Sequence, residues 1–160
     1  MRVRHSGRDR IIVELSSDEW ELLDDLTAEL TTLLDASGTT PPGTPSDPAL
    51  SRLLPDAYRE DAEAAAEFRR FTEDELVTAK LADARTLADA AQSGSDLTLD
   101  RTSVIPWLRT LTDLRLVLAV RLGIHTDDDT GDTSPEAEPA QQVYFWLGTL
   151  QSWILEALQR

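Results

Sequence analysis

The chain has 160 residues, no cysteine, and a formal net charge of −15 at pH 7. A chain of this length can bury roughly 70% of its unfolded surface in one core, so folding requires no disulfide or metal. The lack of cysteine excludes a disulfide framework, a thiolate nucleophile and a cysteine-ligated zinc site in this chain. The charge argues against nucleic acid as a partner of the whole surface, because phosphate binding depends on clustered positive charge.

No segment has the character of a membrane-inserting sequence. No stretch reaches the roughly 18 uninterrupted apolar residues of a transmembrane helix. The N-terminus is basic and lacks the apolar run of a signal peptide. The sequence therefore predicts a soluble, cytoplasmic protein without membrane contact, folded as a single helical domain over residues 1–160.

The first 35 residues predict a β-hairpin followed by a helix. Residues 1–15 hold two β-prone runs on either side of a Ser-Gly-Arg-Asp turn, and residues 97–99 could add a short strand to them. Ser16 and Glu19 have the spacing of a capping box. This spacing predicts a helix that begins there and runs to about residue 35.

The middle of the chain predicts a loop and two helices. Residues 36–48 are rich in Gly, Pro, Ser and Thr and lack an apolar period, which predicts a flexible loop. Asp47 and Pro48 supply an N-cap and a first-turn proline for a helix that reaches residue 71. Thr72 and Glu75 repeat the capping-box spacing, which predicts a separate helix to about residue 91.

The segment WLRTLTDLRLVLAVRLG, residues 107–123, is apolar on nearly every side of the helix that it would form. A helix of this kind belongs in the middle of a core. Four charged residues interrupt it, namely Arg109, Asp113, Arg115 and Arg121. Each needs a partner or a route to water, because an unpaired buried charge is costly. The predicted fold class is mainly α, a helical bundle around this central helix with a small N-terminal β-hairpin.

The last part of the chain predicts an acidic loop and a final helix. Residues 126–138 carry six acidic residues and no basic one, which predicts a disordered loop. Pro139 opens a helix with a broad apolar stripe. Its aromatic residues Trp146 and Trp153 are expected to be largely buried against the central helix.

Asp61 and Arg115 each occupy one position of an otherwise apolar helical seam. The simplest joint explanation is that the two seams face each other and the side chains form a buried ion pair that fixes helix register. In the alternative explanation, Arg115 or Arg121 opens toward a pocket and binds an anionic ligand or a carboxylate of a partner.

No motif for catalysis, a cofactor or a metal is recognisable. The acidic run that begins at Asp127 resembles a calcium loop, but Asp132 stands where the sharp turn needs glycine. The two histidines, His5 and His125, do not have the Glu-x-x-His spacing of a di-iron bundle. There is also no G-x-S-x-G motif and no phosphate-binding glycine loop. The sequence predicts a protein that is not an enzyme and has no catalytic residue, cofactor or metal site.

Three stretches together resemble one protein family in order and spacing: RLLPDAY at residues 52–58, EFRRFTE at 67–73, and WLR, DLRLVL and RLG within 107–123. The final helix is also similar. The family consists of small proteins from high-GC Gram-positive bacteria, described as a domain of unknown function and as AosR-like oxidative-stress transcriptional regulators. The resemblance implies a non-enzymatic stress regulator that acts on transcription through partner proteins. Thr112 departs from the family motif, which usually has Asn there, and no cysteine is present to sense oxidants.

The charged and aromatic residues of these motifs and seams are the candidates for an interaction site. They are Arg52, Tyr58, Asp61, Arg69, Arg70, Asp113, Arg115 and Arg121. The expected partner is a protein, for example a component of the transcription machinery.

Two other functions stay open. One is direct DNA binding through a local patch of arginines. That patch would combine Arg2, Arg4, Arg8 and Arg10 of the hairpin with Arg69 and Arg70. The other is a small-molecule-binding protein or a carboxylate-based enzyme, with a pocket lined by Tyr58, Arg115 and Arg121.

Overall fold

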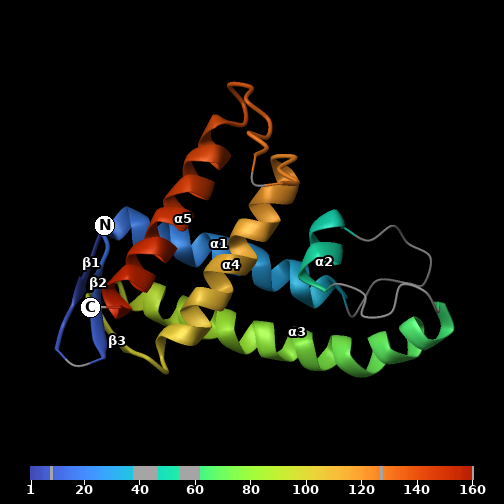
Figure 1. Cartoon of the computed structure of the whole chain (residues 1–160), viewed down its shortest axis with the longest axis horizontal. Helices are drawn as coiled ribbons and strands as arrows, with labels where there is room; N and C mark the ends of the chain where they lie inside the picture. The colour runs from blue at the N-terminus through green and yellow to red at the C-terminus, as the bar shows by residue number, and fades with distance from the viewer. Residues whose placement is uncertain (8, 38–46, 55–61, 127, 160) are drawn as a thin grey trace.

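The computed structural model describes residues 1–7, 9–37, 47–54, 62–126 and 128–159, and between 62 and 93 it describes the side chains from residue 72 onward. The described residues form three strands and five helices (Figure 1). In chain order these are β1 (Arg2–His5), β2 (Arg10–Glu14), α1 (Ser17–Ser37), α2 (Pro48–Leu53), α3 (Ala62–Ser93), β3 (Leu97–Asp100), α4 (Val104–Arg121) and α5 (Glu138–Leu158). The predicted mainly α fold with an N-terminal hairpin is confirmed.

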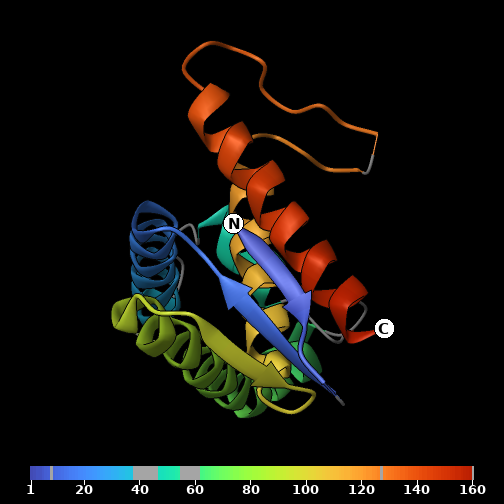
Figure 2. The ribbon, with the colours of Figure 1, turned by 90° about the vertical axis from the view of Figure 1, so that its left-hand side faces the viewer.

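The strands form one antiparallel sheet in the order β1-β2-β3. Val13 lies opposite Val3 of β1, and Ile11 lies opposite Leu99 of β3. Ile11, Val13 and Leu99 are buried, so one face of the sheet belongs to the core. The predicted extra strand is therefore confirmed, and the sheet covers one end of the helices (Figure 2).

The start of α1 confirms the first capping box. The backbone N–H of Glu19 donates to Ser16 Oγ over 3.3 Å, and the Ser16 N–H donates to Glu19 Oε2 over 2.8 Å. One turn further on, Trp20 packs edge-on against Trp107 of α4, with ring centroids 6.0 Å apart. The capped first turn thus leads directly into the core.

α4 is the central helix. It contacts α1, α2, α3 and α5, and its residues Trp107, Leu111 and Leu114 are buried (Figure 1). A core around α4 was the main prediction from the apolar segment. None of the helices in the described part of the chain combines the length and apolar character that a membrane span requires.

α3 corrects the prediction of a helix start at Thr72. It runs without a break from Ala62 to Ser93, so Thr72 and Glu75 lie inside it. The capping-box pattern was misleading here because no glycine or proline lies between residues 62 and 93 to interrupt α3. The prediction of one helix from Pro48 to residue 71 is also wrong, because α2 ends at Leu53. Threonine and glutamate at this spacing are also compatible with a helix interior.

α5 begins at Glu138, next to the predicted Pro139, and packs on α4 through its apolar side. Trp153, however, is 39% exposed, so its predicted burial was wrong. The buried positions of α5 include Leu147, Leu150 and Ile154. Trp153 lies at the border of that stripe, next to the strand β1.

Several hydrogen bonds tie the described part of the segment 126–138 to the helices around it. The N–H of Asp132 donates to the carbonyl of Leu122 over 2.7 Å, and Gln141 Nε2 of α5 donates to the Asp132 carbonyl over 2.6 Å. The carboxylate of Asp129 accepts the N–H groups of His125 and Thr126. The disorder predicted from the acidic composition stays a prediction.

Candidate interaction face on the central helix

One side of α4 is only partly covered by the rest of the described fold. Its residues recur at spacings of three and four, which places them on one side of the helix. Ile105 is 44% exposed, Thr112 is exposed, and the others are half-buried. We call this surface the α4 face and define it by Ile105, Leu108, Thr112, Leu116 and Ala119. Residues of α3 border it on one side and residues of α5 border it on the other.

The α3 border of the α4 face is a hollow of about 580 Å³. Apolar side chains line part of it, and four charged side chains, two of each sign, line the rest together with a threonine. The lining residues are Leu76, Ala79, Lys80, Asp83, Leu108, Arg109, Thr112 and Asp113. A concave apolar surface with a few convergent polar groups is the usual form of a binding site.

Lys80 and Asp113 form the floor of this hollow. Lys80 Nζ donates to Asp113 Oδ1 over 2.7 Å, and the two side chains are only 18% and 8% exposed. Burial raises the pKa of Asp113, while the hydrogen bond and the positive charge of Lys80 oppose that rise. The sequence indicated that Asp113 needs a partner. It did not name Lys80, although Lys80 is the only lysine in the chain.

The α5 border is built around Arg115. Its guanidinium lies over the ring of Tyr144, 5.0 Å from the centroid, and Nη1 donates to Gln151 Oε1 over 3.0 Å. Gln151 Nε2 donates in turn to Thr112 Oγ1 over 2.7 Å. A Cβ at Gly148 would lie 3.4 Å from the guanidinium carbon, so the absent side chain gives the arginine room. Among the described residues, the buried Nε of Arg115 has no hydrogen-bond acceptor.

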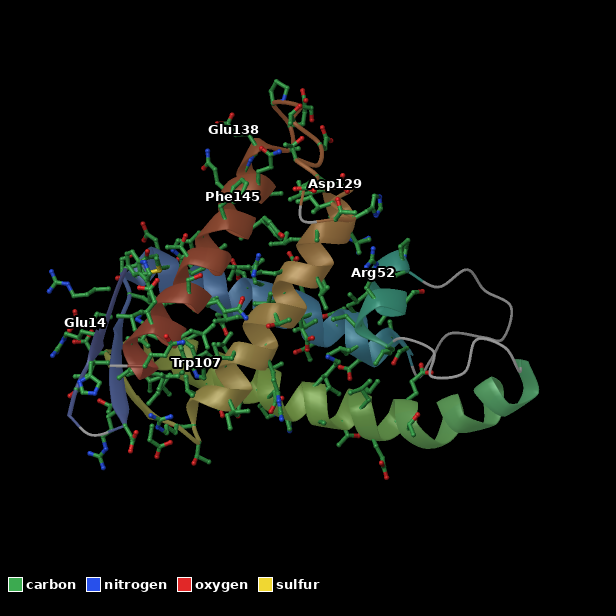
Figure 3. All side chains as sticks on the ribbon, in the orientation of Figure 1. Glu14, Arg52, Trp107, Asp129, Glu138 and Phe145 are labelled. Carbon is green, nitrogen blue, oxygen red and sulfur yellow. The ribbon has the colours of Figure 1, made fainter. Side chains whose placement is uncertain are left out.

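α2 borders the C-terminal end of the α4 face. Arg52 is exposed and lines a hollow of about 170 Å³ together with Leu116 and Ala119 (Figure 3). Arg121 Nη2 donates to Asp47 Oδ2 over 2.6 Å, and the Asp47 carboxylate also accepts the N–H of Ala49 at the start of α2. The hydrogen bond from Arg121 lowers the pKa of Asp47.

The structure thus brings three predicted candidates, Arg52, Asp113 and Arg115, to the borders of the α4 face. The fourth candidate, Arg121, forms an ion pair with Asp47 instead. Tyr58 and Asp61 lie outside the described residues, as do the side chains of Arg69 and Arg70. The pairing of Asp61 with Arg115 therefore stays a prediction.

Three contributors to the site were not predicted, namely Lys80, Tyr144 and Gln151. Lys80 could have been noticed in the sequence because it is the only lysine. Tyr144 and Gln151 are spaced seven apart on α5, as residues on one helix side are, but only the packing of α5 on α4 shows that this side meets Arg115.

Two charged side chains beside the α4 face are engaged within the protein, Asp113 with Lys80 and Arg115 with the Tyr144 ring. In the described residues, no group of three or more histidine, aspartate or glutamate side chains could hold a metal ion. An apolar centre with polar borders provides contact area and orientation for a bound chain.

Comparison with known proteins places the chain near mycobacterial regulators. The family profile described as "Domain of unknown function (DUF2017)" matches residues 1–158. The "Putative oxidative stress regulator AosR" of Mycobacterium leprae is 36% identical over 131 residues, which cover 71% of this chain and 59% of that protein. The "Oxidative stress regulator AosR" of Mycobacterium tuberculosis is 33% identical over 135 residues, with the same coverage. The match therefore spans less than two thirds of these relatives, and no solved structure matches the chain.

Proposed function

This chain belongs to the DUF2017 family, and on that premise we propose that it is a non-enzymatic regulator of the response to oxidative stress that acts through protein–protein contacts. The names of its mycobacterial relatives support the regulatory part of this proposal. The contact mechanism and the link to transcription are our proposal for this chain.

The α4 face is the observation that carries the proposed mechanism. Ile105 is 44% exposed, Leu108, Leu116 and Ala119 are half-buried, and Leu76 of α3 is 39% exposed beside them. A partly exposed apolar strip of this kind supports an interaction site, because exposed apolar surface often marks such sites in soluble proteins. The strip from Ile105 to Ala119 is about 21 Å long at 1.5 Å per residue, which fits a partner helix of three to four turns.

The partner that fits is an amphipathic helix with acidic residues beside its apolar stripe. Arg109 is 67% exposed at one border of the α4 face, where its Nη1 lies 3.6 Å from Asp83 Oδ2, and Arg52 is exposed at the end of the face. Carboxylates of a bound helix could pair with both, which would orient it along α4. An apolar stripe alone would give no such direction.

A protein partner is favoured over direct DNA binding. Of the hairpin arginines, Arg4 Nε already donates to Glu14 over 2.9 Å, and Arg2 Nε lies 4.0 Å from the same carboxylate. The chain as a whole is strongly acidic. Transcription would then respond through the protein that the α4 face binds.

Site-specific photocrosslinking in cells tests the proposal. A photoreactive amino acid at Ile105 or Thr112 should capture the same partner, and one at the exposed Thr86 of α3 should not. With the identified partner purified, Ile105→Asp should weaken binding by about tenfold or more, because it places a charge in an apolar contact. Thr86→Asp is the matched control.

The same two variants connect binding to function. Ile105→Asp should abolish the protein's effect on transcript levels after peroxide stress, and Thr86→Asp should preserve it. Equal crosslinking from positions 105 and 86 would contradict the proposal. So would an Ile105→Asp protein that binds and regulates like the wild type.

A further inference from the structure

β1 has one edge without a strand neighbour among the described residues, since the sheet order is β1-β2-β3. The Ser6 N–H donates to the Arg10 carbonyl over 2.8 Å, so this pair is hydrogen-bonded. Hydrogen-bonded pairs alternate along an antiparallel ladder. Val3 and His5 therefore direct their N–H and C=O groups away from β2, toward the free edge.

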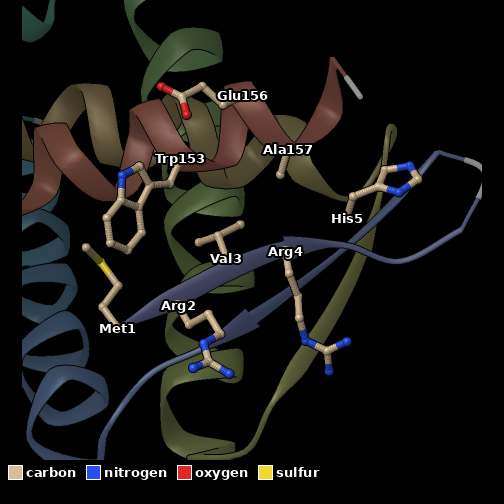
Figure 4. Close-up of a pocket in the computed structure, with 8 residues that line it drawn as sticks. All are labelled: Met1, Arg2, Val3, Arg4, His5, Trp153, Glu156 and Ala157. Atoms are coloured by element: carbon tan, nitrogen blue, oxygen red, sulfur yellow. The ribbon is translucent and has the colours of Figure 1, made fainter.

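α5 stands beside this edge and forms a groove with it. The hollow between them has a volume of about 600 Å³. It is lined by Met1, Arg2, Val3, Arg4 and His5 along the strand and by Trp153, Glu156 and Ala157 on the helix (Figure 4). An unpaired strand edge beside a helix is the arrangement that accepts an extended peptide as an added strand.

The two sides of the groove differ in chemistry. Val3 points toward α5, where Trp153 and Ala157 provide an apolar wall, whereas Arg2 and Arg4 point away from α5 (Figure 4). Arg2 is 75% exposed, and Arg4 shares with it the single carboxylate of Glu14. One carboxylate for two guanidinium groups leaves positive charge at the outer side of the edge.

We propose that this groove binds an extended segment of a partner protein as a fourth strand on β1, with apolar and acidic residues in alternation. Residues that lie directly opposite each other on neighbouring strands have their side chains on the same face of the sheet. Apolar residues of the added strand would meet Val3 and Trp153, and acidic residues would lie beside Arg2 and Arg4.

Two features of the groove favour this occupant. A second copy paired through its own β1 would bring Arg2 and Arg4 against the same arginines, and like charges across a strand pair are destabilising. Charged residues on an edge often serve only to prevent pairing. That role needs no helical wall, whereas here Trp153 is an exposed aromatic beside the unpaired backbone.

This site lies on a different side of α5 from Tyr144 and Gln151, which border the α4 face. The inference is therefore independent of the proposed function. Either surface could fail its test without affecting the other.

Peptide binding to the full chain, measured by fluorescence anisotropy, tests the proposal. The probes are labelled eight-residue peptides with Glu alternating with Val, Leu or Phe. At least one should bind about tenfold more tightly than the same composition in block order. Two N-methylated versions of the binding peptide, one with the odd and one with the even backbone nitrogens methylated, separate strand addition from other modes. An added strand bonds β1 through every second residue, so one version should lose binding and the other should keep it.

Variants of the protein locate the site. Arg2→Glu and Trp153→Ala should each weaken binding by about tenfold, and Phe145→Ala, at an exposed position elsewhere on α5, should leave it unchanged. Arg2 is exposed, so the Arg2→Glu variant should fold and still test the proposal if the Trp153→Ala variant unfolds. Amide chemical shifts of Val3 and His5 should move on binding.

Three results would overturn the proposal. The first is no binding by any alternating peptide at about 1 mM. The second is that the block-order peptides bind as tightly as the alternating ones, or that the two N-methylated peptides bind equally, which would exclude strand addition. The third is that the peptides do not bind, whereas a single-stranded oligonucleotide binds and loses its binding in the Arg2→Glu variant. This edge would then be a nucleic-acid contact.

Discussion

α4 carries one charged side chain against α3 and another against α5, and the two sides differ in how that charge is stabilised. Toward α3, the small carboxylate of Asp113 is almost fully buried and has a direct ion pair with Lys80. Toward α5, the long side chain of Arg115 lies over an aromatic ring and bonds an amide, with no carboxylate among its described partners.

The difference follows from the two side chains. A carboxylate on one methylene cannot reach water from a buried helix position, so it needs a cation beside it. A guanidinium is planar, weakly hydrated and carried on a long stem, so a ring face and an amide oxygen can satisfy most of it. We therefore expect the α3 side to depend on one partner and the α5 side on several weak ones.

Removal of the lysine should have the largest effect. Lys80→Met leaves the Asp113 carboxylate buried without its cation, which typically costs about 3–5 kcal/mol of unfolding free energy. Urea denaturation of the variant measures this. The double variant Lys80→Met/Asp113→Leu should recover most of the loss, because it removes both charges. Additive losses in the double variant would show that the pair is not coupled.

The loss in Lys80→Met should also depend on pH. The pKa of Asp113 is raised above 3.8 in the folded protein, mainly by burial. The folded state then binds more protons than the unfolded state between these two values, so this contribution is fully present below pH 3.8 and is lost as pH rises through the folded pKa. Without Lys80 the folded pKa should rise further.

The stability difference between wild type and Lys80→Met should consequently widen from about pH 4 toward pH 7. Denaturation at a series of pH values measures it. Lys80→Met/Asp113→Asn is the control and should show no widening. A pH-independent difference in Lys80→Met itself would mean that Asp113 is not the group left unpaired.

These two sides also show what the sequence could and could not predict. The need of Asp113 for a partner was readable, because a charge inside an apolar helical segment has few alternatives. Its partner was not, since Lys80 meets Asp113 only when α3 packs on α4, 33 residues away in sequence. Local features such as the Ser16 capping box and the hairpin were predicted correctly because they depend on neighbouring residues.

The predictions of the helix start at Thr72 and of the burial of Trp153 failed, because both depend on packing between segments that are distant in sequence. The Thr72 pattern did not say whether a helix starts or continues there, and α3, which begins at Ala62, continues through it. The apolar stripe of α5 was too broad to show that Trp146 packs partly buried against the core whereas Trp153 is 39% exposed.

Replacement of Arg115 should cost less than replacement of Lys80. Arg115→Met loses the contact with the Tyr144 ring and the hydrogen bond to Gln151, which together contribute about 1–2 kcal/mol. Urea denaturation checks the value. A loss as large as that of Lys80→Met would break the contrast between the two sides.

A double-mutant cycle of Asp61→Ala with Arg115→Met tests the pairing predicted from sequence. Coupling above about 1 kcal/mol would add a carboxylate to the α5 side and make the two sides alike. Additive effects would exclude the pair and sharpen the difference.

The smallest effect is expected at the end of α4. Arg121 is half exposed to water, so Arg121→Ala should destabilise by less than about 1 kcal/mol despite the 2.6 Å contact with Asp47. Thermal denaturation in low and high salt measures this, and the difference should shrink as salt screens the pair. A loss comparable with that of Lys80→Met would contradict the view that burial decides the cost.

The single lysine has a practical consequence. Lysine acylation can modify only one side chain of this protein, and that side chain lies in the contact between α3 and α4. Lys80 Nζ is held 2.7 Å from Asp113 Oδ1 at the floor of the hollow, so acylation of Lys80 should report how often this ion pair opens. Mass spectrometry of the Lys80 peptide would follow this opening in the unmodified sequence, without an introduced label.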